Sequence, residues 1–147
     1  TSELKSKDSR YSVAHLDDGK FKTAWFEGKP NDGQGERITF SFPAKDWPKN
    51  AAKEISLWGF RLVNGYGKSD RDWRANGRVK SLKVYLNDVP KVILQLRDSR
   101  QVQHVSFDGF YIHDKDRVSV EILEVIPGKR SHHTAITELL PLGDNWF

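Results

Sequence analysis

The chain has 147 residues, of which 37% are hydrophobic and 30% are charged. This length suits one domain with a buried core, and the composition excludes a disordered tail and a membrane protein, since no stretch approaches the roughly 20 apolar residues that cross a bilayer. The absence of cysteine excludes disulfides, thiol catalysis and zinc–thiolate sites, and a net charge of +4 from 24 basic and 20 acidic residues is only a weak indication of an anionic partner.

Short runs of β-branched and aromatic residues, separated by turn signals, predict an all-β sandwich or barrel. Helical periodicity is scarce, and at most a turn or two of helix is expected, near Ser12–Leu16. A single domain, residues 1–147, accounts for the chain because it contains no repeat and no linker-like segment. The predicted strands are, in chain order, Arg37–Phe42, Glu54–Val63, Val79–Leu86, Lys91–Leu96, Gln101–Phe107, Arg117–Val125 and Thr134–Leu140.

In the second predicted strand, the apolar side chains change from odd to even positions at Gly59. Ile55 and Leu57 lie on one face of an extended chain, whereas Trp58, Phe60 and Leu62 lie on the other. A β-bulge at the glycine would let both sets face one core.

Three of the five tryptophans differ in their predicted environment. Trp25 is predicted to line the core beneath its loop, and Trp58, in mid-strand, is predicted to be a core residue as well. Trp47 lies beside Pro48 in a polar stretch and is a candidate for an exposed ring, but no other candidate binding residue surrounds it.

Two predicted loops, Gly19–Glu36 and Gly65–Arg78, are longer than a sandwich requires. Long loops on a rigid scaffold commonly carry function, so a binding site is expected there. The second loop contains the only concentration of basic residues, with Arg71, Arg74 and Arg78 around one tryptophan.

Three blocks of the sequence carry a family resemblance. DGKFKTAWFEG (Asp18–Gly28), followed by GQGERITFSF (Gly33–Phe42), has the spacing Asp-Gly-x3-Thr-x-Trp, and resembles the opening of discoidin-like, galactose-binding-like jelly rolls. NGYGKSDRDWRANGRVKSLKVYLND (Asn64–Asp88) and PGKRSHHTAITEL (Pro127–Leu139) resemble the NADase-type glycan-binding subset of that superfamily. Together the blocks cover most of residues 11–140.

The resemblance implies a jelly-roll β-sandwich of about eight antiparallel strands whose loops present a ligand site. The sequence departs from the family pattern at Trp73, where another aromatic residue, commonly tyrosine, is usual, and in the added segment Pro141–Phe147. The first departure keeps an aromatic ring. The superfamily includes binders of sugars, lipids and proteins, so the fold does not by itself identify the ligand.

A structural calcium ion is predicted at the first loop. Asp18 offers a carboxylate, Lys20 a backbone carbonyl, and Thr23 hydroxyl and carbonyl oxygens, while the family resemblance implies Glu138 as a further ligand. The alternative is an ordinary turn with a solvated Glu138, because the basic side chains of Lys20 and Lys22 weaken the field for a divalent ion.

The ligand itself is predicted to bind at the loop Gly65–Arg78. A sugar packs its C–H face on an aromatic ring, and its hydroxyl groups bind amide, guanidinium and carboxylate groups around the rim. The alternative is that some of these side chains hold the loop's own fold, in which case Arg71, Trp73 and Arg74 remain for recognition. The predicted ligand-binding residues are Tyr66, Arg71, Trp73, Arg74, Asn76, Arg78 and, from the neighbouring loop, Glu27.

These observations predict a non-catalytic, extracytoplasmic carbohydrate-binding module, secreted or in a bacterial cell envelope. Its partner would be a glycan or glycoprotein, and the arginines suit a sulfated or sialylated one. The alternative is a protein-interaction or adhesion domain that uses the same loops on a host or cell-surface protein. A chain that begins with Thr1 is compatible with export, since a signal peptide is removed from the mature protein.

Other functions are less well supported by the residues. No Ser, His and acid grouping or close carboxylate pair indicates an enzyme. His132 and His133 would point in opposite directions in a strand, which disfavours a shared zinc ion. Asp70 and Asp72 lie between the arginines, which disfavours a nucleic-acid partner, and no membrane insertion is expected.

Overall fold

The computed structural model describes residues 25–27, 31–41 and 54–144, and within these ranges it is an all-β sandwich. The described segments also contain a short 3-10 helix, η2 (Asn31–Gly33), and one α-helix, α1 (Asp70–Ala75). The strands are β1 (Trp25–Phe26), β2 (Arg37–Ser41), β3 (Ile55–Asn64), β4 (Arg78–Leu86), β5 (Val89–Gln95), β6 (Gln103–Ile112), β7 (Arg117–Ile126) and β8 (Ala135–Gly143).

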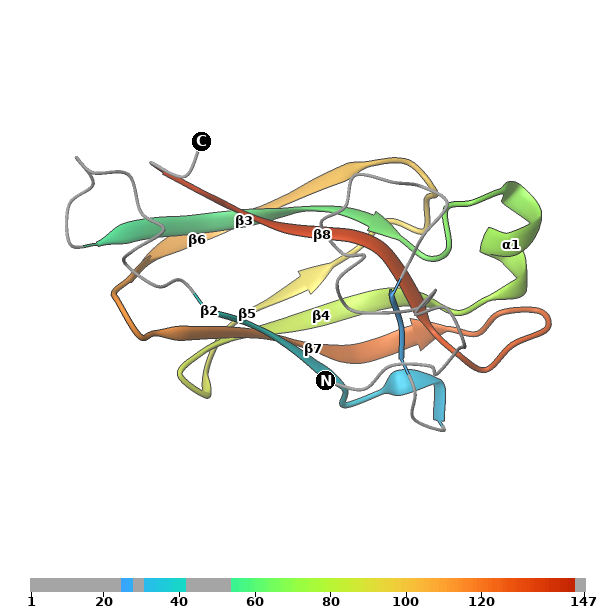
Figure 1. The fold of residues 1–147 in the computed structure, drawn as a ribbon, viewed down its shortest axis with the longest axis horizontal. Coiled ribbons are helices and arrows are strands. Elements are labelled where there is room, and N and C mark those ends of the chain that lie inside the picture. Colours follow the sequence, from blue (N-terminus) through green and yellow to red (C-terminus); the bar gives the residue numbers. More distant parts are fainter. Residues whose placement is uncertain (1–24, 28–30, 42–53, 145–147) are drawn as a thin grey trace.

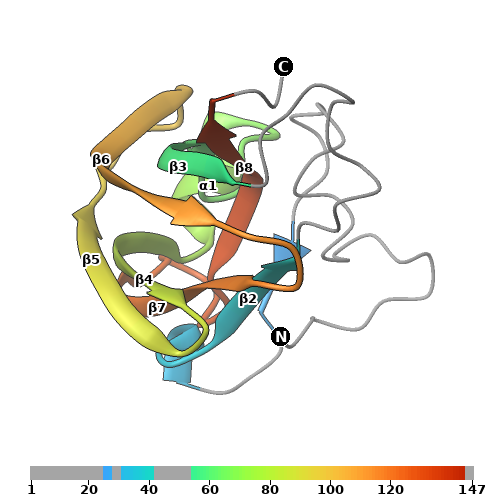
Figure 2. The ribbon, with the colours of Figure 1, turned by 90° about the vertical axis from the view of Figure 1, so that its left-hand side faces the viewer.

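Two four-stranded sheets face each other (Figures 1 and 2), one in the order β1-β8-β3-β6 and the other in the order β2-β7-β4-β5. Each pair of neighbouring strands is antiparallel. The edge strands β5 and β6 follow one another in the chain and lie on the same side of the sandwich (Figure 2). The predicted fold class is therefore confirmed.

The core lies between the sheets and follows the alternation of the strands. On β4 and β7, for example, Leu82 pairs with Ile122 and Val84 with Val120, and all four are buried. Trp25 on β1 is fully buried among the same residues, as predicted. Leu57, Phe60 and Leu62 on β3 complete the core from the other sheet, while Trp47 lies outside the described residues. Among the described residues, no helix is long and apolar enough to span a bilayer.

The predicted bulge in β3 is confirmed. The pairing of β3 with both β6 and β8 shifts register between Leu57 and Gly59. The prediction that Trp58 is a core residue was wrong. Its ring is 38% exposed, and its Nε1 donates a hydrogen bond to Asp144, 3.3 Å away. The reason is that the buried apolar side chains switch from odd to even positions only after Trp58. A Cβ atom on Gly59 would lie 2.8 Å from the carbonyl oxygen of Val105, so a larger residue does not fit here.

We predict that Gly59→Ala destabilises the domain by about 1–3 kcal/mol, because the added methyl group must displace backbone of β6. Urea unfolding followed by circular dichroism measures this. Ser106→Ala, at the exposed position paired with Gly59, is the control and should change stability by under about 0.5 kcal/mol. Equal stability of Gly59→Ala and the parent chain would contradict the close packing described here.

The helix α1 lies where a loop was predicted. The expected helical turn near Ser12–Leu16 is outside the described residues. Ser69 is the N-cap of α1: its hydroxyl accepts the backbone N–H of Asp72 at 3.1 Å and donates to the Asp72 carboxylate at 2.9 Å. These reciprocal bonds satisfy groups that a helix start otherwise leaves unpaired. At the other end, Asn76 donates a hydrogen bond from its side chain to the carbonyl of Asp72 at 2.8 Å.

A polar cluster lies at the opposite end of the sandwich, where β3 begins and β6 ends. His113 Nε2 is 3.0 Å from a Glu54 carboxylate oxygen, and His113 Nδ1 is 3.4 Å from Asp116. The hydrogen bond to Glu54, with smaller contributions from both carboxylates, raises the pKa of His113 above its usual 6.5. Hydrogen bonds from the Asn87 side chain and the His113 backbone lower the pKa of Asp116.

The raised pKa of His113 gives a pH dependence with a defined sign. Because protonation is favoured in the folded state, its contribution to stability is present below the unfolded pKa of about 6.5 and is lost as pH rises through the folded value. We predict that Glu54→Gln lowers the pKa of His113, measured by NMR titration of the imidazole protons. Glu124→Gln, which removes an exposed carboxylate of β7 away from His113, is the control and should leave the titration of His113 unchanged.

Candidate ligand-binding site

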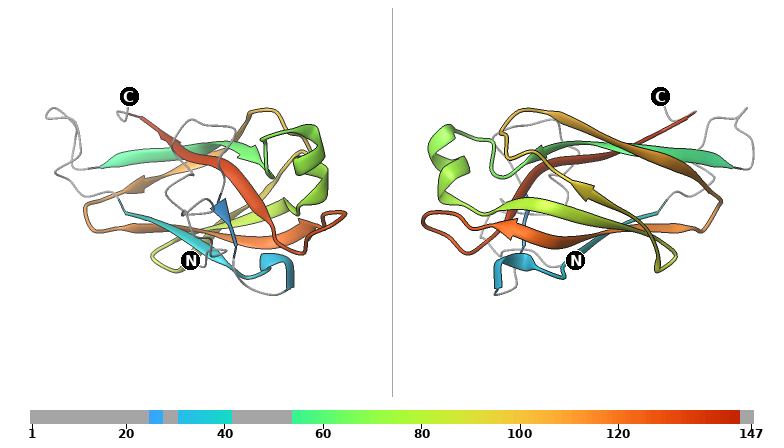
Figure 3. Two further views of the ribbon diagram at one scale, coloured as in Figure 1. Left: turned by 45° about the vertical axis from the view of Figure 1, so that its right-hand side comes forward. Right: turned by 180° about the vertical axis from the view of Figure 1, so that it is seen from behind.

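Three connecting segments meet at the end of the sandwich where α1 lies (Figure 3), and we call this region the α1 end. It consists of residues 65–77 with α1, residues 96–102 between β5 and β6, and residues 127–133 between β7 and β8. These segments contain seven basic and three acidic side chains, a net charge of +4 with neutral histidines. That equals the net charge of the whole chain, so the excess of positive charge is concentrated here.

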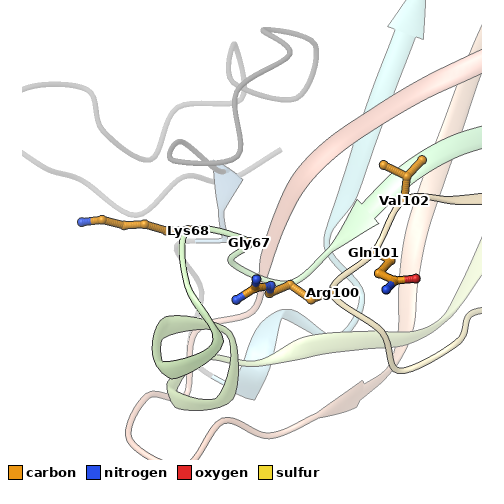
Figure 4. Close-up of a pocket in the computed structure, with 5 residues that line it drawn as sticks. All are labelled: Gly67, Lys68, Arg100, Gln101 and Val102. Atoms are coloured by element: carbon orange, nitrogen blue, oxygen red, sulfur yellow. The ribbon is translucent and has the colours of Figure 1, made fainter.

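A pocket of about 460 Å³ opens at the α1 end, between the first two of these segments. Gly67 and Lys68 form one wall, on the turn that precedes α1, and Arg100, Gln101 and Val102 form the other, on the β5–β6 loop (Figure 4). Sequence reasoning placed Lys68 in the functional loop but did not consider the β5–β6 loop. Its signal was a polar run, Arg97–Gln101, between two apolar strands.

The first wall is held by Thr137 on β8. The Thr137 hydroxyl accepts the backbone N–H of Gly67 and donates to the carbonyl of Gly65, both at 2.8 Å. Gly65 has a φ of +76°, a conformation that glycine adopts without strain. All three residues are buried, so the hydroxyl satisfies two backbone groups that water does not reach.

We predict that Thr137→Val destabilises the domain by about 2–4 kcal/mol, because it leaves a buried N–H and a buried C=O without this partner at nearly constant volume. Thermal and urea unfolding measure the change. Thr39→Val is the matched control, since Thr39 is exposed on β2 and bonds only the Ser119 hydroxyl, 3.1 Å away. Its effect should stay under about 1 kcal/mol; similar losses in the two variants would contradict the role given to Thr137.

The second wall is closed by Gln103, the first residue of β6. Its side-chain amide accepts the backbone N–H of Arg97 and donates to the Arg97 carbonyl, both at 3.0 Å. The side chain is buried and joins the two ends of the loop. The loop that carries Arg100 and Gln101 is therefore fixed at its base.

An ion pair joins the two walls. Arg78, 9% exposed, donates from Nε and Nη2 to the two carboxylate oxygens of Asp98 at 3.0 and 3.1 Å. Its guanidinium group also lies over the Trp73 ring, 4.3 Å from the centroid, and the Trp73 indole N–H donates to the carbonyl of Asn64 at 3.0 Å. Through these contacts α1, β4 and the β5–β6 loop hold one another in place.

The third segment of the α1 end packs on the last turn of α1. The backbone N–H of Lys129 donates to the carbonyl of Arg74, and those of Arg130 and Ser131 donate to the carbonyl of Ala75, each at 3.0 Å. A Cβ atom on Gly128 would lie 2.3 Å from the Ala75 carbonyl oxygen. Three long-range hydrogen bonds and a close glycine contact thus fix this short helix.

Residues 1–140 match the family described as the NAD glycohydrolase translocation F5/8 type C domain. The chain belongs to this family. Its fold is similar to the NMR structure of the Streptococcus pyogenes NAD+-glycohydrolase translocation domain, with 22% sequence identity, a TM-score of 0.51 and coverage of 81% of this chain and 96% of that one. This second likeness concerns the fold alone. A search of curated proteins found no match.

Within this F5/8 type C domain, several predicted ligand residues support the loop instead. Trp73 was predicted as a stacking platform, but Arg78 covers the ring and its N–H is already bonded. Arg78 itself is neutralised by Asp98, Asn76 binds the helix backbone, and Tyr66 is buried. Each of these side chains is thus engaged inside the domain, and its contact with a ligand stays a prediction.

Glu27 was expected to bind the ligand at the rim of the site, but it does not line the pocket. It is fully buried, and its carboxylate accepts the backbone N–H of Thr134 at 3.1 Å and lies 3.5 Å from His133 Nδ1. Gly33 packs so closely on the Glu27 side chain that a Cβ atom there would lie 2.4 Å from Cγ. Glu27 therefore joins β1 to the start of β8.

The remaining predicted residues, Arg71 and Arg74, are exposed on α1. Arg74 pairs with Asp70 one helical turn earlier, with 3.0 Å between Nε and the carboxylate. Arg71 makes no ion pair with any residue that the structure describes. Neither residue lines the pocket, but both belong to the α1 end beside it.

Only one residue of the predicted calcium site can be located. Asp18, Lys20 and Thr23 lie outside the described residues, whereas Glu138 is 2% exposed and its Oε2 binds Arg61 Nη1 at 2.9 Å. The carboxylate is thus buried and paired with a guanidinium group, and the calcium site stays a prediction. Within the described ranges no cluster of three His, Asp or Glu residues is arranged to hold a metal.

Proposed function

We propose that this F5/8 type C domain is a non-catalytic module that binds a glycan in the pocket at the α1 end. The observation that carries the proposal is the lining of the pocket: a space of about 460 Å³ is lined by Lys68, Arg100 and Gln101, which carry ammonium, guanidinium and amide groups, together with Gly67 and Val102. Sites for small saccharides combine a concave surface, some apolar contact and a few polar groups that bind hydroxyls.

The rigidity of both walls supports the same function. The turn at Gly67 is fixed by Thr137, and the β5–β6 loop is fixed by Gln103 and by the Arg78–Asp98 pair. A site whose walls are held in the unbound state loses little conformational entropy when a ligand enters. Weakly binding ligands such as sugars gain most from this preorganisation.

The family supports an accessory rather than a catalytic role. Its description names the translocation domain of an NAD glycohydrolase, and the similar Streptococcus pyogenes structure carries the same designation. We propose that the present domain likewise serves a secreted or cell-envelope bacterial protein, and that binding of a glycan or glycoprotein holds that protein at a surface. Arg71, exposed next to the pocket on α1, is then available to an extended glycan.

The proposal predicts that the domain binds saccharides on a glycan array and that calorimetry confirms the hits. Gln101→Ala should weaken the affinity about tenfold, because a hydrogen bond to a sugar hydroxyl contributes roughly 1 kcal/mol or more. Gln95→Ala, an exposed glutamine on β5 away from the pocket, is the matched control and should bind as the parent does.

Two results would count against this function. A domain that retains no saccharide on the array, or that binds one equally well after Gln101→Ala, does not use the pocket for glycans. Capture of a purified surface protein that persists after enzymatic deglycosylation would favour the alternative, a protein-interaction or adhesion domain.

A further inference from the structure

We propose that the glycan bound in this pocket carries a single acidic group, a carboxylate or a sulfate, which Lys68 and Arg100 hold from the two walls. The inference rests on the proposed function and specifies its substrate class. It depends on three observations: the ion pairs of the α1 end, the hydrogen-bonding character of the pocket lining, and the distribution of charge.

Ion pairs neutralise some of the basic residues in and beside the α1 end. Arg78 is bound by Asp98 and Arg74 by Asp70. Lys68 and Arg100, in contrast, are exposed and make no ion pair with any described carboxylate. The two basic residues that line the pocket are therefore not neutralised by the domain itself.

The lining is rich in donors and poor in acceptors. Lysine and arginine side chains donate hydrogen bonds but accept none, and the side-chain carbonyl of Gln101 is the one side-chain acceptor among the five lining residues. Neutral sugar hydroxyls both donate and accept, and sites for them usually include carboxylates. A group that only accepts, such as a carboxylate or a sulfate, matches this lining better and forms stronger, charge-assisted hydrogen bonds.

The two side chains come from different walls of the pocket. In Figure 4, Arg100 extends from the β5–β6 loop toward the turn that precedes α1, while Lys68 extends outward from that turn. The planar guanidinium group can bind two oxygens of one acidic group, and the flexible lysine stem can bring the ammonium group over it. Because each wall supplies one cation, a single acidic group is contacted from both.

The wider charge distribution favours the approach of an anion. The net charge of +4 at the α1 end raises the local concentration of anionic ligands and their association rate. Three aspartates, Asp70, Asp72 and Asp98, interrupt the basic surface outside the pocket. This arrangement suits one localised negative charge better than the continuous phosphate backbone of a nucleic acid.

Calorimetry and a glycan array with matched neutral, sialylated and singly sulfated oligosaccharides test the inference. Lactose, 3′-sialyllactose and 3′-sulfated lactose serve as one such series. We expect the acidic members to bind at least tenfold more tightly than the neutral parent, and the preference to decrease as sodium chloride rises from 50 to 500 mM.

The variant Lys68→Gln/Arg100→Gln should remove the preference, so that acidic and neutral members bind equally. Lys83→Gln/Lys91→Gln is the matched control: it removes two positive charges on β4 and β5, outside the pocket, and should keep the preference. Both pairs are on the surface, so thermal unfolding should show folded proteins of similar stability.

The outcomes separate this inference from the function on which it rests. Equal binding of neutral and acidic glycans, or a preference that persists in Lys68→Gln/Arg100→Gln, overturns the acidic-group inference and leaves glycan binding intact. Binding of single-stranded DNA as tightly as of the sulfated sugar also overturns it, in favour of a general polyanion surface. No binding to any saccharide on the array overturns the proposed function itself.

Discussion

The structure of the candidate site depends on the contact of Arg78 with Asp98 and Trp73. Arg78 begins β4 in one sheet, and the Trp73 indole beneath it bonds the carbonyl of Asn64 at the end of β3 in the other sheet. Asp98 then attaches the β5–β6 loop to the same point. A partly buried arginine with a bidentate partner and an aromatic face is held in one orientation, and removal of either partner leaves a charge in a poorly solvated place. Both walls of the pocket derive their relative position from this one guanidinium group.

Much of the fold could be predicted from the sequence because its signals are local. The alternation of apolar and polar side chains in a strand depends only on residues that are neighbours in the sequence. Its change at Gly59 therefore predicted the bulge without any knowledge of strand pairing. The error at Trp58 has a physical reason, since parity alone does not say on which side of the irregular position the change occurs. The helix α1 had a local signal too, in the spacing of Ser69 and Asp72, but glycines and arginines around it favoured a loop interpretation.

The candidate site was less predictable because its contacts join distant residues. Tryptophan, asparagine and arginine in one loop are the residue types that bind sugars, and they are equally the types that hold a loop together. The role of Arg78 depends on its partner Asp98, a carboxylate in a different connecting segment of the chain. The buried position of Glu27 depends on its hydrogen bond with Thr134, next to the start of β8. Neither partner can be inferred from the neighbouring sequence. Three of the five residues that line the pocket, Arg100, Gln101 and Val102, come from a short loop whose only sequence signal is a polar run between apolar strands. What distinguishes Lys68 and Arg100 is that they line the pocket and also make no ion pair with any described residue, a combination that depends on the three-dimensional structure.

The attachment of both pocket walls to late strands has a consequence for folding. Gly67 is bonded by Thr137, seventy positions later in the chain, and α1 is fixed by backbone donors of the segment that leads into β8. A helix of this length is unstable in isolation, and contacts of such separation form only when the loops between them have closed. The pocket therefore forms only when β8 joins its sheet, and a nascent or stretched chain in which β8 is not in place lacks the pocket. Binding of the proposed ligand would therefore be thermodynamically linked to retention of β8 in its sheet, so that any process that extracts this strand would also release that ligand.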